Sequence, residues 1–301
     1  MRPLPPALTL IAIAAALALI AAGFTAGFTA RIVAGPDHPS PSASTPDGAP
    51  PAASPSEDTP PPASGPADGP ADPPRILLVT ATAGFHHDSI STAQAVVQQL
   101  GRQSGQFEVT LLSDVRSLPA LNAEALARHR AVFFANTSGE LPLDATQKQA
   151  LLDFVAAGGG FVATHSASDT FYTWPAYGGL LGAYFHEHPW TTKVDVTVDT
   201  PQHPLTAGLG DSFAIFDEIY VFRTNPRATA RVLLTLDGDS LGTGDDHPLA
   251  WCTHYGAGRV VYNALGHFDS TWQDERFQTF LLGAVRWATG QLEADCGAGG
   301  A

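Results

Sequence analysis

The stretch GGGFVATHSASDT, from Gly158 to Thr170, decides the fold class of this chain. The apolar residues 161–163 predict a buried strand, and this strand runs directly into His165 and Asp169. Open α/β sheets bind ligands beyond the carboxyl ends of their strands, where polar side chains collect. The stretch therefore predicts an α/β sheet with a functional site at this strand end.

A second strand ends in the same way further along the chain. In RVVYNALGHFDSTW, from Arg259 to Trp272, an apolar strand is followed by His267 and Asp269. Parallel strands deliver their carboxyl ends to one edge of a sheet. We therefore expect the two strand ends to contribute to one shared site.

The first half of the folded part alternates between strand and helix patterns. Strands are expected at 75–81, 107–113, 131–136 and 161–165, and helices at 88–102, at 123–129 and from Asp144 through Val155. Asp144 and Gln147 have the spacing of a capping box. Such alternation predicts right-handed βαβ units and a mainly parallel sheet with helices on both faces.

The second half has a different rhythm, with extra strands. A loop with a short helix is expected at 174–185, and strands at 193–199, 213–222, 231–236, 248–255 and 259–264. A final helix is expected at about 273–289, opened by Thr271 and Asp274 as a capping box.

Composition divides the chain into four parts: 1–34, 35–74, 75–290 and 291–301. Residues 7–30 carry no charged side chain and are long enough to cross a bilayer, which takes roughly 20 apolar residues. They form either an uncleaved anchor or a cleaved signal peptide, and both predict export. Residues 35–74 are rich in Pro, Ala and Ser, which predicts a disordered tether, and 291–301 is expected to be a flexible tail.

The charge and the cysteine content exclude other classes. The formal net charge is −14 and no basic cluster occurs, which argues against nucleic acid as a partner. The two cysteines, Cys252 and Cys296, cannot form a disulfide framework. Because Cys296 falls in the expected tail, unpaired cysteines are favoured and a single bridge is the alternative.

Several motifs together resemble the trehalose-utilisation (ThuA-like) family. They are GFHHDSI (84–90), GGGFVATHSASDT, WPAYGGLLGAYFHEHP (174–189), FDEIYVF (216–222), PLAWCTHYGAGRVVYNALGH (248–267) and the terminal RWATG. The resemblance covers nearly all of 75–290. It implies a flavodoxin-like fold related to the class I glutamine amidotransferase superfamily, and a link to disaccharide metabolism.

The chain departs from the amidotransferase pattern at the elbow after the central strand. Those relatives carry a catalytic cysteine there, whereas this chain has His165. A neutral imidazole cannot replace a thiolate in thioester formation, so the chain is not expected to be a glutamine amidotransferase. Ser166 lacks the flanking glycines of a G-x-S-x-G elbow, which disfavours a serine nucleophile.

The candidate site draws on residues from both halves. The catalytic candidates are His87, His165, Asp169, Glu218 and His267, and the substrate-binding candidates are Tyr220, His188 and Trp174. The resemblance points to His87, which follows the first strand. Asp169 would orient His165 or accept sugar hydroxyls. Glu218 and Tyr220 share a strand face, which suits proton transfer or is merely a solvated face.

A competing interpretation concerns His186 and His188. On a strand, residues two apart face the same side and could bind one metal ion. The flanking Phe185 and Pro189 instead predict a loop.

The leading interpretation is an exported domain that acts on a disaccharide or keto-sugar derivative by acid–base chemistry. The alternative is a non-catalytic carbohydrate-binding or scaffold module displayed at the cell envelope. The partners are then a small-molecule sugar and, through the N-terminal segment, a membrane. The sequence specifies neither the oligomeric state nor a cofactor, and a divalent metal such as zinc is an open alternative. One shared site requires the rings of His87, His165 and His267 to lie within about 12 Å of one another.

Overall fold

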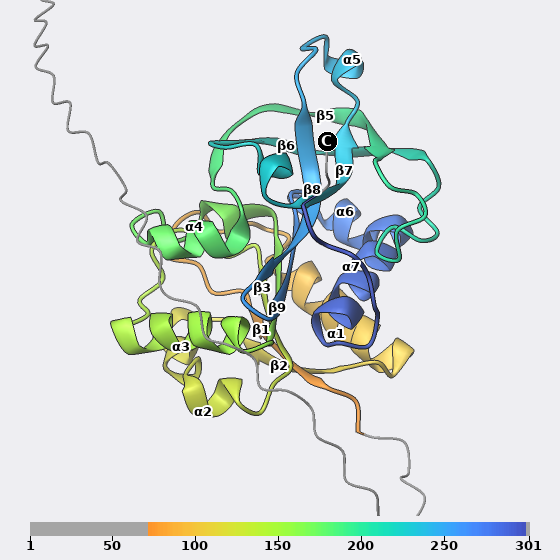
Figure 1. Ribbon diagram of the computed structural model, residues 1–301. Coiled ribbons are helices and arrows are strands. Elements are labelled where there is room, and N and C mark those ends of the chain that lie inside the picture. Colours follow the sequence, from red (N-terminus) through yellow and green to blue (C-terminus); the bar gives the residue numbers. More distant parts are fainter. Residues whose placement is uncertain (1–71, 299–301) are drawn as a thin grey trace, which may run out of the picture. The chain divides into compact units, whose positions relative to one another are not determined.

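The computed structural model describes residues 72–298 (Figure 1). All of them fall within one compact unit of the chain. The apolar segment 7–30 and nearly all of the tether 35–74 lie outside the described residues. Within 72–298, no helix is both long and apolar enough to cross a membrane.

Five parallel strands form the first half of a nine-stranded sheet. They are β1 (Arg75–Val79), β2 (Glu108–Leu112), β3 (Ala131–Ala135), β4 (Gly160–Thr164) and β9 (Gly258–Asn263), in the order β2-β1-β3-β4-β9. The strands β3 and β4 are buried along their whole length, as expected when both faces are covered. The predicted parallel βαβ half is confirmed.

Helices cover both faces of this half (Figure 1). They are α1 (Ile90–Ser104), α6 (Asp269–Gln273) and α7 (Glu275–Ala288) on one side, and α2 (Ala123–Leu126), α3 (Ala145–Ala156) and α4 (Pro175–Leu181) on the other. The capping box that opens α3 is confirmed, because Asp144 accepts the N–H of Gln147 and the Gln147 side chain accepts the N–H of Asp144.

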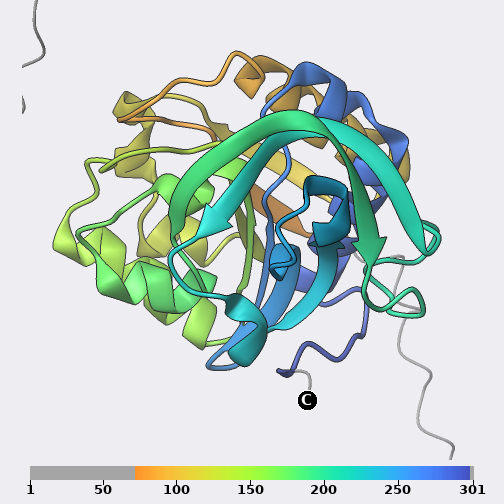
Figure 2. The same ribbon diagram turned by 90° about the horizontal axis from the view of Figure 1, so that it is seen from above.

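Four antiparallel strands complete the sheet. They are β5 (Phe185–Val198), β6 (Ser212–Phe222), β7 (Arg231–Leu236) and β8 (His247–Tyr255), and they extend the order as β9-β8-β7-β5-β6. A short helix, α5 (Gly238–Leu241), lies between β7 and β8. Seen from above, the long β5 and β6 curve as an arch across the molecule (Figure 2). This arch carries part of the site.

Two local predictions were wrong. His186 and His188 lie in β5, which begins at Phe185, and not in a loop. Two register shifts between β5 and β6 accommodate this segment, which contains a proline unable to donate a ladder hydrogen bond. The final helix is split: Asp274 is the N-cap of α7, accepting the N–H groups of Arg276 and Phe277, while Thr271 lies in the separate helix α6.

The C-terminal segment is attached to the fold as far as the structure describes it. Cys252 in β8 and Cys296 form a disulfide with a Cα–Cα distance of 5.3 Å, inside the usual range. Arg231 pairs with Asp295 at 2.7 Å and Arg259 with Glu293 at 3.0 Å. The expectation of unpaired cysteines is therefore wrong. Tail composition alone does not reveal that a cysteine will meet a buried partner.

Candidate functional site

His165 occupies a strained elbow at the end of β4. Its φ is +49°, in the left-handed region that residues with a side chain rarely adopt, and a short 3₁₀ helix (His165–Asp169) follows. The side chain is completely buried, and its Nδ1 lies 2.8 Å from the carbonyl oxygen of Ala264. The Tyr262 hydroxyl donates to the His165 carbonyl at 2.7 Å. The elbow thus fixes both the position and the ring orientation of His165.

The three predicted histidines meet at the carboxyl edge of the parallel strands. Ring centroids lie 4.7 Å apart for His87 and His165, 5.1 Å for His87 and His267, and 5.3 Å for His165 and His267. The residues follow β1, β4 and β9, respectively. The predicted convergence is confirmed by this geometry.

The arch supplies the carboxylate of the cluster. Glu218 Oε2 lies 3.1 Å from His267 Nδ1 and 3.6 Å from His165 Nε2, and its Oε1 lies 3.1 Å from His188 Nδ1. The Tyr220 hydroxyl, also from β6, lies 3.1 Å from His165 Nε2. The antiparallel half therefore completes a site that the parallel half begins.

Asp217 was not among the predicted site residues, yet it joins the two halves. Its carboxylate is fully buried and accepts the backbone N–H groups of Gly266 (2.8 Å), His267 (3.1 Å) and Glu218 (2.8 Å). Burial raises the pKa of Asp217 to about 6, against the lowering effect of these hydrogen bonds. The alternation of β6 turns Asp217 away from the face of Glu218 and Tyr220, so the sequence pattern did not indicate its contact with the loop after β9.

Gly266 is required where the loop after β9 passes the elbow. Its φ is +134°, and a Cβ there would lie 3.4 Å from both the His165 Cβ and the Asn136 Oδ1. Its carbonyl accepts hydrogen bonds from Asn136 Nδ2 at 2.8 Å and from Trp272 Nε1 at 2.9 Å. These contacts hold His267 at a fixed place beside His165.

The environment drives the histidine pKa values apart. Burial, followed by the neighbouring His267, lowers the pKa of His87 to about 4. Burial also holds the pKa of His165 well below its ordinary value. The hydrogen bond to Glu218 is the main cause that raises the pKa of His267. Two imidazoles that resist protonation thus face a third that is protonated more readily.

A cavity of about 250 Å³ opens onto the cluster. Its lining residues are Phe85, His87, Asp169, Phe185, His188, Glu218, Tyr220 and His267. Asp169 has a pKa raised by burial and lies at this cavity. The expectation that Asp169 orients His165 was wrong, because the Ala264 carbonyl occupies the His165 Nδ1. Asp169 instead lines the cavity, where its carboxyl group can contact a ligand.

Trp174 does not line this cavity, which contradicts its expected contact with substrate. Its ring stacks on Tyr177 at 5.8 Å between centroids and packs edge-on against Phe171. The ammonium group of Lys148 lies 5.4 Å from the ring centroid. Trp174 is therefore a packing residue beside α4.

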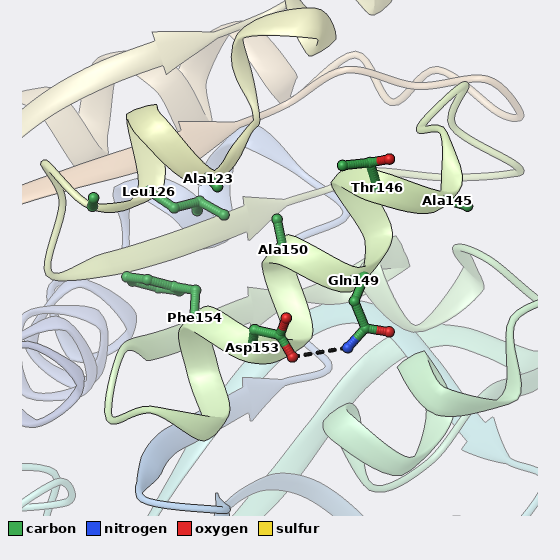
Figure 3. Close-up of a pocket in the computed structure, with 9 residues that line it drawn as sticks. Ala123, Leu126, Ala145, Thr146, Gln149, Ala150, Asp153 and Phe154 are labelled. Carbon is green, nitrogen blue, oxygen red and sulfur yellow. Dashed lines mark hydrogen bonds between the residues drawn. The ribbon is translucent and has the colours of Figure 1, made fainter.

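A larger cavity, of about 660 Å³, lies between α2 and α3 (Figure 3). Small and apolar residues such as Ala123, Leu126 and Phe154 dominate its lining. The lining carboxylate, Asp153, accepts a hydrogen bond from Gln149 at 2.8 Å. With no cluster of titratable groups, this cavity is a weaker candidate for chemistry than the smaller one.

Two groups of side chains in the described part of the chain have donor atoms close enough to hold a metal ion. One is His87, His165, Glu218 and His267. The other is His203, Cys252 and Cys296, but the two cysteines are joined in the disulfide. His203 also contacts the carbonyl of Asp295 and the N–H of Leu205. The first group is therefore the candidate metal site.

Comparison with known families identifies the chain. The ThuA family model, described as trehalose utilisation, matches residues 75–288, so the chain belongs to the ThuA family. A ThuA-like protein from Bacteroides uniformis shares 25% identity at a TM-score of 0.62, covering 75% of this chain and 95% of that one.

A ThuA-like protein from Parabacteroides merdae shares 21% identity at a TM-score of 0.61, covering 72% of this chain and 90% of that one, and supports the fold. No curated protein matches the chain.

Proposed function

We propose that this ThuA-family domain acts on a disaccharide, or on an oxidised (keto) derivative of one, by acid–base chemistry. The family is described by trehalose utilisation, and trehalose is a disaccharide. The observation that carries the proposal is the contact of Glu218 with His267 at 3.1 Å inside a cavity. A carboxylate paired with an imidazole can remove a proton from one sugar atom and return it to another.

The divergent pKa values support this chemistry. His267 holds its proton more tightly than a free imidazole does and suits a general acid, whereas His87 is neutral at pH 7. Sites that separate the pKa values of neighbouring groups in this way commonly perform acid–base catalysis. The two rings lie 5.1 Å apart, so a single small molecule can reach both.

The shape of the cavity supports a substrate of sugar size. Its volume of about 250 Å³ is slightly below the roughly 300–1,000 Å³ of pockets that enclose drug-sized ligands. We infer that it holds one sugar ring and leaves the second ring at the mouth. Phe85 lines the cavity and is 63% exposed, so its ring is available to stack on that second sugar.

The alternative is a binding module without catalysis. Such a module would present an exposed aromatic platform and scattered histidines. Phe85 and Phe216 are exposed aromatic residues, which favours this alternative, but the histidines are clustered around a buried carboxylate. The clustering supports the enzyme.

Turnover of a panel of disaccharides and their keto derivatives by the full chain tests the proposal. Glu218→Gln is expected to reduce turnover by about 10²- to 10⁴-fold, the usual contribution of acid–base catalysis. Glu187→Gln is the matched control, since Glu187 is exposed in β5, and its turnover should be unchanged. Saturable sugar binding without turnover of any substrate would favour the binding module.

We also propose that the domain functions outside the cytoplasm, delivered by the apolar segment 7–30. The disulfide between Cys252 and Cys296 supports this, because such bonds persist mainly in oxidising compartments. The starting residue of the purified chain distinguishes a cleaved signal peptide from an anchor. A reduced, full-length chain in the cytoplasm would contradict export.

A further inference from the structure

We propose that His87, His165, His267 and Glu218 form a binding site for a divalent transition metal, with Zn²⁺ as the best fit. The ion would take part in the proposed reaction by acting on the same sugar. That catalytic role rests on the proposed function, whereas metal binding itself does not.

The donor atoms have the separations of a tetrahedral zinc site. Zinc–nitrogen bonds of 2.0–2.1 Å place neighbouring ligand atoms about 3.3–3.4 Å apart. Here the His165 Nε2 lies 3.1 Å from His87 Nε2 and 3.3 Å from His267 Nδ1. Glu218 Oε2 lies 3.1 Å from His267 Nδ1 and 3.6 Å from His165 Nε2. All four donor atoms lie within 4.8 Å of one another.

Hydrogen bonds alone cannot account for the polar atoms that surround the Nε2 of His165. Its Nδ1 faces the Ala264 carbonyl, which only accepts, so Nδ1 carries the proton and the neutral ring has one lone pair on Nε2. Four polar atoms surround that nitrogen, from His87, His267, Tyr220 and Glu218. One lone pair cannot serve all of them. A cation at the centre would instead accept lone pairs from the two other imidazoles and the carboxylate as well.

The surroundings orient the ligands as metal sites require. A ligating histidine usually donates its second ring N–H to a carbonyl or another polar group, which fixes its tautomer. For His165 that partner is the Ala264 carbonyl at 2.8 Å, and for His87 it is Ser166 Oγ, 3.3 Å from Nδ1. Asp217 holds the backbone of His267.

The chemistry of the ligands favours zinc over calcium or magnesium. Imidazole nitrogens suit Zn²⁺ and other transition metals, while Mg²⁺ and Ca²⁺ prefer oxygen ligands. Ligation uses the neutral form of imidazole, so binding of the ion would displace any proton from the three rings. Three neutral imidazoles and one carboxylate would leave a bound Zn²⁺ with a net charge of +1.

A bound ion would be reached from the cavity, because His87, Glu218 and His267 all line it. A metal there would polarise a sugar carbonyl or hydroxyl oxygen that occupies a fifth coordination position. With Glu218 Oε2 and His267 Nδ1 engaged as ligands, Glu218 Oε1, which lies 3.1 Å from His188 Nδ1, would share the proton transfer with Asp169 and His188. Both residues line the cavity and neither belongs to the ligand set.

Titration of ZnCl₂ into the chelator-stripped full chain, followed by calorimetry, tests the site without any sugar. Reductant is omitted so that Cys252 and Cys296 stay paired. We expect one equivalent of zinc to bind, and the affinity to fall as the pH is lowered because protons compete for the imidazoles. Loss of residues that merely support ligands costs 10–100-fold in affinity, so His267→Ala and Glu218→Gln should each cost at least about 100-fold.

His186→Ala is the matched control, an exposed histidine of the arch that is not in the ligand set, and it should bind zinc as the native chain does. Thermal melts of each variant without metal establish that it is folded. Absence of stoichiometric binding by the native chain, or equal binding by a folded His267→Ala variant, would overturn the site.

The two proposals can fail independently, and the measurements distinguish the two failures. Stoichiometric zinc binding without turnover of any sugar would leave the metal site standing and remove the proposed activity. Sugar turnover that survives chelation, in a chain that binds no zinc, would remove the metal site and leave the activity.

Discussion

The two halves of the sheet contribute to the site in different ways. The parallel half supplies His87, His165 and His267 from the loops that follow its strands. The antiparallel half supplies Glu218 and Tyr220 from within a strand, β6, that arches over those loops (Figure 2). The parallel half alone would bring together the three imidazoles without Glu218, the carboxylate that contacts His165 and His267. The histidines are therefore positioned by topology, whereas the carboxylate of Glu218 is positioned by the packing of one half on the other.

Removing the disulfide should have the largest effect on this packing. It joins β8, in the antiparallel half, to the segment that follows α7, which packs on β4 and β9. Cys252 and Cys296 are 44 residues apart, and closing loops of this size stabilises proteins by about 2–4 kcal/mol. The Cys252→Ala/Cys296→Ala chain should lose about that much unfolding free energy in a denaturant titration.

Reductant provides the control for this prediction. It should lower the stability of the native chain and leave the double variant unaffected. A double variant as stable as the oxidised native chain would show that the two halves hold together without the bridge.

Breaking the Asp217 contacts should have the next largest effect. Asp217→Asn replaces one oxygen by an amide that cannot accept, so at least one buried backbone N–H loses its partner. An unsatisfied buried group costs roughly 1–3 kcal/mol. We expect a loss of stability of that size, measured by thermal melts, together with a shift of the His267 amide signal in NMR spectra.

Glu218→Gln is the matched substitution for Asp217→Asn. It makes the same change one residue away, but the Glu218 carboxylate contacts imidazoles and not backbone N–H groups. It should damage the site while changing stability less than Asp217→Asn does. The reverse order would mean that Glu218, and not Asp217, holds the halves together.

The same contrast explains what could be predicted from the sequence. The convergence of His87, His165 and His267 was predictable, because each follows a strand of a parallel sheet and such strands share one carboxyl edge. The sequence predicts this strand at 193–199, whereas β5 begins at Phe185. Phe185 and Pro189 resemble a loop, and the bulges that accommodate them depend on pairing with β6. Local patterns do not encode register between distant strands.

For the site residues too, local patterns were predictable and contacts between distant segments were not. The period-two alternation of β6 grouped Glu218 with Tyr220, but it gave no sign that Asp217 would meet the loop at Gly266, 49 residues away. Trp174 was misjudged because aromatic residues suit both sugar stacking and packing, and only the contacts with Tyr177 and Lys148 decide between them. The Cys252–Cys296 bridge was missed because the position of Cys296 depends on where the tail lies.

The smallest expected effect comes from a change confined to the parallel half. Asp144→Ala removes the carboxylate that accepts the Gln147 N–H at the start of α3, and loss of such a cap costs about 1 kcal/mol. The helix lies on the far side from α1 and α7, and none of its residues lines the cavity of about 250 Å³. Stability should therefore fall slightly in a melt while zinc affinity and sugar turnover stay at the native values. A loss of zinc affinity or of turnover, in a variant that remains folded, would mean that strain in the parallel half reaches its strand ends. The site would then depend on the internal stability of the parallel half as well as on its contact with the antiparallel half.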